Sequence, residues 1–124
     1  MSVDPTGADL KRLLAEDPGG PVVMLNLLQY RESGVSSYRE YTERIGPFLA
    51  EVGGEVVYAG NLDTPLVAPD GWDWDAVLLV RYPSRQAFSA MVANPEYQKI
   101  TGLRTAALDA AVLQPSTQWG LAGH

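Results

Sequence analysis

Two stretches of this sequence are too uniformly apolar to lie at the surface of a sheet, and they limit the folds open to the chain. Residues 22–28 are Val-Val-Met-Leu-Asn-Leu-Leu, and residues 76–80 are Ala-Val-Leu-Leu-Val. A strand with one face in water alternates apolar and polar side chains, whereas a strand buried on both faces shows a continuous apolar run. The pattern therefore predicts two central strands of a sheet that is covered on both faces.

Helices are expected on both sides of the first apolar run. Leucines at helical spacing predict a leading helix over 9–17, which the Pro-Gly-Gly sequence at 18–20 ends. A second, longer helix is predicted over 37–51, because Ser37 and Glu40 have the spacing of a capping box and apolar residues at helical spacing follow.

The next part of the chain predicts two strands. Gly53-Gly54 ends the second helix, and a strand is expected over 55–60, with a bent or bulged continuation to Val67 left open. A turn at Pro69-Asp70-Gly71 then leads into the strand over 74–82, which contains the second apolar run.

The last third predicts a broken helical region and a final strand. Ser84 and Asn94 are expected to cap two short helices, the second carrying Tyr97, Ile100, Leu103 and Leu108. A strand follows over 110–118, and Pro115 suits an edge position because proline cannot donate to a neighbouring strand.

After the leading helix, the predicted order is strand, helix, strand, strand, helix, strand. This βαββαβ order is the α+β, ferredoxin-like plan with an antiparallel sheet and helices on one face. We expect a single domain over 1–124, with a lead-in over 1–20, the core over 21–118 and a tail over 119–124. Because the helices cover only one face of doubly apolar strands, we expect a homodimer in which a second copy covers the other face.

Composition removes several classes of function. The chain has no cysteine, and its one histidine is His124, so disulfides, thiolate metal sites, a Ser-His-Asp triad and a metal site are not expected. The net charge is −6 and the nine basic residues are not clustered, so nucleic acid is an unlikely partner. No apolar run is long enough to span a membrane and no signal peptide is evident, so we expect a cytoplasmic protein without a membrane partner.

An ordered set of short motifs carries a family resemblance over about residues 20 to 115. The motifs are PVVMLNLL at 21–28, GG at 53–54, WDAV at 74–77, RYPSR at 81–85 with Ala87, Phe88 and Met91, and NPEYQ at 94–98 with Arg104. This set resembles the small bacterial proteins grouped as domain of unknown function 1330 (DUF1330).

The resemblance implies the dimeric α+β barrel, in which two ferredoxin-like sheets pack face to face. It implies no settled activity, because the wider superfamily looks like a collection of different groups, among them cofactor-free oxygenases of phenols, lactone isomerases and haem-using enzymes. The histidine that binds haem in the last group has no counterpart inside this chain. We therefore expect chemistry without a cofactor, if the protein is an enzyme.

Asn26 is the most informative single position, because an amide within an apolar strand must find a hydrogen-bond partner. It shares a face with Met24 and Leu28. If that face is turned toward the helices, Asn26 lies in a sheet–helix cleft and can bind a carbonyl or enolate oxygen as a catalytic residue. The alternative is an amide with a purely structural hydrogen bond.

Two arginines are candidates for binding an oxygen anion. Arg81 interrupts the second apolar strand, on the face of Val77 and Leu79, and is a candidate catalytic residue; Arg104 on the last helix is a candidate for binding substrate. The structural alternative is that such an arginine pairs with a carboxylate of the chain.

Aromatic side chains supply the other candidates. Tyr38 is a candidate proton relay, and Tyr41 and Tyr97 are candidates for substrate contact. Trp74, within Trp72-Asp73-Trp74-Asp75, is a candidate wall for a flat substrate. The alternatives are a core-facing aromatic stripe for the tyrosines and a tryptophan that closes the end of the sheet beside a solvated turn.

The residues thus favour a homodimer that binds a small molecule and, if it is an enzyme, acts without a cofactor on an enolisable or phenolic metabolite, as an oxygenase or isomerase. The competing hypothesis is a non-catalytic ligand-binding or assembly module with a vestigial pocket. An empty cavity near Asn26 is the observation that separates the two.

Overall fold

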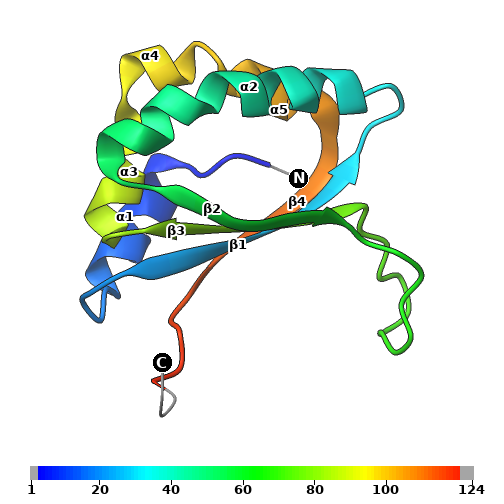
Figure 1. Cartoon of the computed structure of the whole chain (residues 1–124), viewed down its shortest axis with the longest axis horizontal. Helices are drawn as coiled ribbons and strands as arrows, with labels where there is room; N and C mark the ends of the chain where they lie inside the picture. Colours follow the sequence, from blue (N-terminus) through cyan, green and yellow to red (C-terminus); the bar gives the residue numbers. More distant parts are fainter. Residues whose placement is uncertain (1–2, 121–124) are drawn as a thin grey trace.

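The computed structural model describes residues 3–120, which form one antiparallel sheet and a layer of helices over it (Figure 1). The predicted tail over 119–124, including His124, falls largely outside the described residues. The elements are α1 (Gly7–Ala15), β1 (Val22–Tyr30), α2 (Val35–Val52), β2 (Glu55–Asn61), β3 (Ala76–Tyr82), α3 (Arg85–Ala93), α4 (Pro95–Gln98), α5 (Thr101–Ala107) and β4 (Leu108–Ser116).

The sheet has the order β2-β3-β1-β4, with every neighbouring pair antiparallel. The two apolar runs are β1 and β3, which confirms that they are the central strands, and β4 is an edge strand that tolerates Pro115. Helices α2 to α5 lie over one face of the sheet (Figure 1), and α1 packs beside α3. The predicted ferredoxin-like fold is confirmed.

The hydrophobic core lies between this sheet and its helices. Alternate residues of the central strands, among them Met24, Leu28 and Val80, are buried there. The residues between them, such as Leu25 and Leu79, face the other side of the sheet, which we call the open face, and are half-buried. On β2, Val57 lies at a bulge and is half-exposed.

The start of α2 differs from the prediction. The helix begins at Val35, with Gly34 in the N-cap position and no side-chain cap, so Ser37 is not a cap. A side chain at position 34 would collide with the carbonyl oxygen of Ala107, which explains the glycine. Ser37 instead donates a hydrogen bond to the Leu103 carbonyl oxygen (2.8 Å) and ties α2 to α5.

The end of α2 and the caps of the later helices agree with the sequence. Gly53 ends α2 in the left-handed conformation (φ 77°). Ser84 accepts a hydrogen bond from the Ala87 backbone nitrogen (3.0 Å), and Asn94 accepts one from that of Glu96 (2.9 Å).

Three other predictions need correction. The helical region after Asn94 forms two helices, and Leu108 begins β4 rather than extending α5. The strand predicted to begin at Trp74 begins at Ala76, and β2 ends at Asn61, so the segment 62–75 is a long loop. At Leu108 the side chain is 1% exposed as the first residue of β4, so packing of the strand satisfies the apolar residue that the helical spacing had included.

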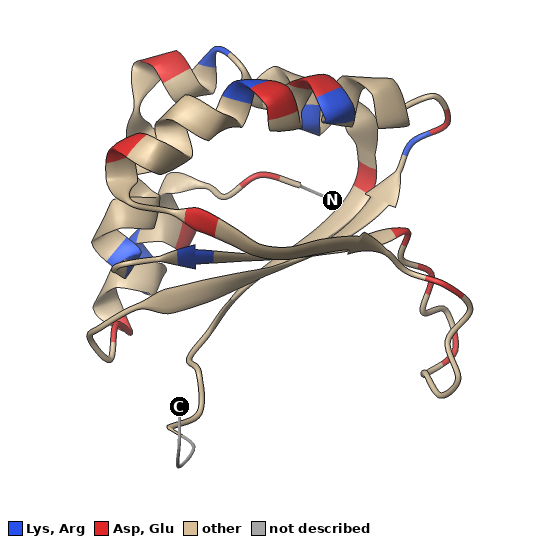
Figure 2. Cartoon of the chain, in the orientation of Figure 1, with Lys and Arg blue, Asp and Glu red and all other residues tan. Residues whose placement is uncertain are grey.

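Charged side chains gather on the helices and loops, while the strands are nearly free of them (Figure 2). Strand β1 contains none, and β3 contains Arg81 alone. Within residues 3–120, no helix combines the length and apolar character needed to cross a membrane.

Candidate functional site

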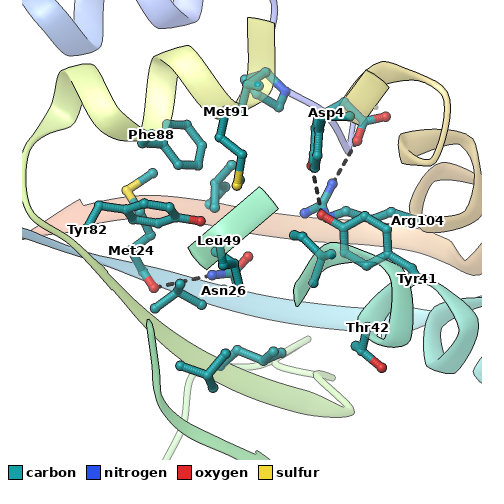
Figure 3. Close-up of a pocket in the computed structure, with 18 of the residues that line it drawn as sticks. Asp4, Met24, Asn26, Tyr41, Thr42, Leu49, Tyr82, Phe88, Met91 and Arg104 are labelled. Atoms are coloured by element: carbon teal, nitrogen blue, oxygen red, sulfur yellow. Dashed lines mark hydrogen bonds and ion pairs between the residues drawn. The ribbon is translucent and has the colours of Figure 1, made fainter. Parts of the chain in front are cut away.

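A cavity of about 220 Å³ lies between the sheet and the helix layer (Figure 3). Its wall is mostly apolar and aromatic, and the residues come from both layers: Met24, Val56, Leu78, Val80 and Leu113 from the sheet, and Tyr38, Tyr41, Ile45, Leu49, Phe88, Met91, Val92 and Tyr97 from the helices. The polar side chains on the wall belong mainly to Asp4, Asn26, Thr42 and Arg104. A cavity of this kind suits a small apolar molecule with a few polar atoms.

Asn26 lies in the floor of this cavity, on the helix-facing side of β1. Its neighbours across the two ladders are Leu78 and Leu113. The side-chain Nδ2 donates a hydrogen bond to the Met24 carbonyl oxygen (3.2 Å), and within residues 3–120 the amide oxygen accepts none. The structural partner is therefore the strand's own backbone, while the other end of the amide remains available to a ligand.

Arg104 is the buried cation of the site, with 4% of its surface exposed. Its Nη1 donates to the Asp4 carboxylate (2.9 Å) and to the Val3 carbonyl oxygen. Its Nη2 is buried and has no hydrogen-bond partner in the part of the chain that the structure describes. Nearly all buried polar groups in proteins are hydrogen-bonded, so this nitrogen is an exception that requires an explanation.

The N-terminal segment places Asp4 beside the cavity. Figure 1 shows this segment entering the space between the sheet and the helices. Asp4 and Pro5 line the cavity, and Thr105 also donates a hydrogen bond to the Asp4 carboxylate. Asp4 and Pro5 therefore form one side of a cavity whose other lining residues lie between positions 24 and 113.

Three tyrosines follow one another along the cavity wall. The Tyr38 and Tyr41 rings are 5.5 Å apart, and the Tyr41 and Tyr97 rings are 6.4 Å apart. The Tyr41 and Tyr97 hydroxyl oxygens share a hydrogen bond of 2.7 Å. The rings thus connect α2 to α4, and Tyr41 lies near Arg104 (Figure 3).

The raised pKa values of Tyr38 and Tyr41 determine whether these phenols act as hydrogen-bond donors or as bases. Burial raises the pKa of Tyr38 to about 12, although the nearby Arg104 charge opposes the rise. Burial also raises the pKa of Tyr41, and the Tyr97 hydroxyl adds to the effect. At neutral pH both phenols therefore keep their protons and act as hydrogen-bond donors, not as bases.

The structure thus places Asn26, Tyr38, Tyr41, Tyr97 and Arg104 around one cavity, and it places two other candidates elsewhere. Arg81 lies on the open face, where its Nη1 is 3.7 Å from the Glu55 carboxylate. Trp74 lies in the loop 62–75, with its ring 6.3 Å from that of Trp72. Neither contributes to the cavity wall.

The acidic residues beside Trp74 have structural partners. The Asp75 carboxylate accepts a hydrogen bond from the Tyr30 backbone nitrogen (2.8 Å). The Gln29 side chain donates to the Asp73 backbone carbonyl oxygen (2.9 Å) and to the Asp73 carboxylate (3.5 Å). Among the described residues, no group of three or more histidine, cysteine, aspartate or glutamate side chains is close enough to hold a metal ion.

Asp4 and Thr42 are the polar wall residues that sequence reasoning missed. Thr42 lies four residues after Tyr38, so the helical stripe that contains Tyr38 is a signal for it. Asp4 gave no signal, because nothing in a local pattern connects residue 4 with residue 104.

Solved structures with the same fold include one close relative. A protein of unknown function from Rhodopseudomonas palustris is 30% identical, with a TM-score of 0.86 over 96% of this chain and 98% of its own. Two more distant structures are similar in fold alone. A dimeric ferredoxin-like protein of unknown function from Jannaschia sp. CCS1 is 14% identical (TM-score 0.62; 80% of this chain, 100% of its own). SnoaB, a cofactor-independent oxygenase from Streptomyces nogalater, is 15% identical (TM-score 0.60; 86% and 100%).

A comparison with functionally curated proteins finds no match. The family model described as domain of unknown function (DUF1330) matches residues 28–114, which include β1 from Leu28 onward, helices α2 to α5, strands β2 and β3 and most of β4. The chain therefore belongs to the DUF1330 family, as its motifs predict.

Proposed function

We propose that each chain binds a small, largely apolar molecule in the cavity between the sheet and the helices. The observation that carries the proposal is the cavity itself, about 220 Å³ with an apolar wall into which Asn26 and Arg104 bring polar atoms. A vestigial pocket filled by Phe48, Phe88 or Met91 is disfavoured, because the space is open although Phe88 and Met91 lie beside it.

The functional unit that we propose is a homodimer formed through the open faces of two sheets. Leu25 and Val77 are among the apolar residues of this face, and the helices α2 to α5 lie on the opposite side (Figure 1). The loop 62–75 and the C-terminal segment extend past the sheet on the open side (Figure 1), and the loop carries Leu66 and Val67, which are 99% and 91% exposed. Burial against a second copy explains such exposed apolar residues, and the dimeric ferredoxin-like relative supports it.

Catalysis without a cofactor is the second candidate function, with an enolisable or phenolic molecule as substrate. The similarity in fold to a cofactor-independent oxygenase supports it. In this scheme Asn26 and Arg104 stabilise a developing oxyanion, and Tyr38 donates a hydrogen bond. Asp4 is the one carboxylate among the described residues of the wall, so it is the group that can accept a proton.

Ligand binding can be tested with 2-acetonaphthone, a neutral bicyclic ketone, as the probe. Met24 and Met91 both line the cavity, so their ¹³C-labelled methyl groups report its occupation by NMR. We expect saturable shifts of both signals in the unaltered protein. Leu78→Trp, which fills the cavity, should remove them.

Val35→Trp is the control, because Val35 is half-exposed at the start of α2, away from the open face, and does not line the cavity. It should leave the shifts in place. Unchanged methyl signals in the unaltered protein, or equal binding by both variants, would overturn the binding proposal.

The same probe separates catalysis from binding alone. An enzyme that forms the enolate removes a proton from the acetyl methyl group and returns a deuteron from D₂O, so deuterium accumulates in the ketone. Exchange faster than in buffer, and lost in Asn26→Ala while the protein remains folded, supports catalysis. Binding without exchange supports the non-catalytic module.

A further inference from the structure

The buried nitrogen of Arg104 that lacks a partner points to the chemical class of the ligand. Arg104 lines the cavity, its Nη1 is saturated by Asp4 and Val3, and its Nη2 makes no hydrogen bond among residues 3–120. A guanidinium Nη2 can only donate, so the missing partner is an acceptor atom. Because Arg104 lines the cavity, a ligand bound there can supply that acceptor.

The charge around Arg104 decides which acceptor fits. The carboxylate of Asp4 lies 2.9 Å from Nη1 and already balances the positive charge. The described wall of the cavity contains no other charged side chain. A ligand carboxylate would therefore leave one negative charge uncompensated in an apolar enclosure, which is strongly unfavourable, whereas a neutral carbonyl oxygen satisfies Nη2 and adds no charge.

The wall around this point suits a ring. Tyr41 lies on one side and Phe88 and Met91 on the other (Figure 3), and Tyr38 also lines the cavity. Aromatic and thioether groups pack favourably on ring faces and edges. The open volume is large enough for a small ring system, and the polar wall atoms are few.

We propose that Arg104 Nη2 is the recognition point for a neutral carbonyl oxygen on a ring-containing ligand, and that Asp4 makes the cavity select such ketones or aldehydes over carboxylates. This inference rests on the proposed function, since it names the ligand class of the same cavity. Asp4 is thus a specificity-determining residue, because its negative charge already balances the positive charge of Arg104.

The test compares 2-acetonaphthone with 2-naphthoate, which differ only by a methyl group in place of a carboxylate oxygen. Binding is followed through the Met24 and Met91 methyl signals. The unaltered protein should bind the ketone more tightly by at least roughly tenfold, the least that an uncompensated buried charge is expected to cost. Asp4→Asn keeps an oxygen acceptor for Nη1 but removes the negative charge, so it should reverse the preference toward the carboxylate.

Arg104→Met completes the comparison, because it removes the donor and should bring the affinity for the ketone down to that for naphthalene. Asp4→Ser, which also keeps an oxygen acceptor, replaces Asp4→Asn if that variant does not fold. Equal binding of ketone and carboxylate by the unaltered protein, or an unchanged preference in the Asp4 variants, overturns this inference and leaves the binding proposal intact. Absence of any shift with all three probes overturns both.

Discussion

The hydroxyl oxygens of Tyr41 and Tyr97 lie 2.7 Å apart and share one hydrogen bond between α2 and α4. Both side chains are almost completely buried, at 5% and 6% exposed. Each hydroxyl is therefore shielded from the water that would otherwise satisfy it. The bond fixes two helices over the cavity, so it links the stability of the helix layer to the shape of the binding site.

Removing one of these hydroxyls should destabilise the protein. Tyr97→Phe leaves the Tyr41 hydroxyl buried without its partner, which should lower the free energy of unfolding by about 1–2 kcal/mol in urea titrations. Tyr41→Phe should cost a similar amount, and the double variant less than the sum of the two. Tyr58→Phe is the control, because Tyr58 is 55% exposed and its loss should change little. Additive effects of the two single variants would contradict this coupling.

Stability should fall at alkaline pH. The pKa of Tyr38 is raised from 10.0 to about 12 in the folded protein, and burial also raises the pKa of Tyr41 and of Tyr82. Above pH 10 the unfolded chain loses these protons while the folded protein keeps them, so the free energy of the unfolded state falls relative to that of the folded one. For Tyr38, this loss of stability runs from about pH 10 to about pH 12.

Urea unfolding at pH 8, 9, 10 and 11 measures this dependence. The free energy of unfolding should decline above pH 10, and Tyr38→Phe should make the decline shallower because one titrating group is removed. A free energy that stays flat to pH 11 would show that these phenols are not shielded from water.

A charge on the open face should separate the proposed dimer. Val77→Asp places a carboxylate where two apolar sheets would meet, and burying it unpaired is unfavourable enough to abolish association. Val35→Asp is the same change at an exposed position at the start of α2, where a negative charge is tolerated. Light scattering after size exclusion should give a dimer for the unaltered protein and Val35→Asp, and a monomer for Val77→Asp. A dimer in all three places the interface elsewhere.

The Asp4–Arg104 ion pair should respond unequally to loss of its two members. The Arg104 side chain is 5% exposed and that of Asp4 31%, so only Asp4 can turn to water when its partner is gone. Asp4→Ala strands a buried cation and should cost about 3 kcal/mol, whereas Arg104→Met should cost less, about 1–2 kcal/mol. Urea unfolding of both variants measures the two changes in the free energy of unfolding. A larger loss for Arg104→Met than for Asp4→Ala would refute this account of the pair.

The alternation of residues along the strands predicts part of the site, but it does not predict which face of the sheet each set of residues occupies. Alternation along β1 places Asn26 on one face with Met24 and Leu28, and the structure turns that face to the helices. The same alternation places Arg81 with Val77 and Leu79, but it does not say which face of the sheet that is. The answer depends on the pairing between strands: Asn26 lies opposite Leu78, so Leu79 and Arg81 belong to the other face.

The helices show the same limit. The glycine at the end of α2 and the caps at Ser84 and Asn94 depend on neighbouring residues, and the sequence predicts them correctly. The start of α2 depends on a close approach between Gly34 and Ala107, which lie far apart in the sequence, so the capping-box pattern at Ser37 misplaces it. Rules based on neighbouring residues succeed where the contacts are local. They do not predict the contact between Asp4 and Arg104, which are a hundred positions apart.

The placement of Asp4 also makes the cavity depend on contacts between distant parts of the chain. Asp4 and Arg104 are a hundred positions apart, and β1 pairs with β4 over a similar separation. Contacts between such distant residues form slowly compared with hairpins and helices. We therefore expect the cavity wall to be complete only once these distant segments have come together.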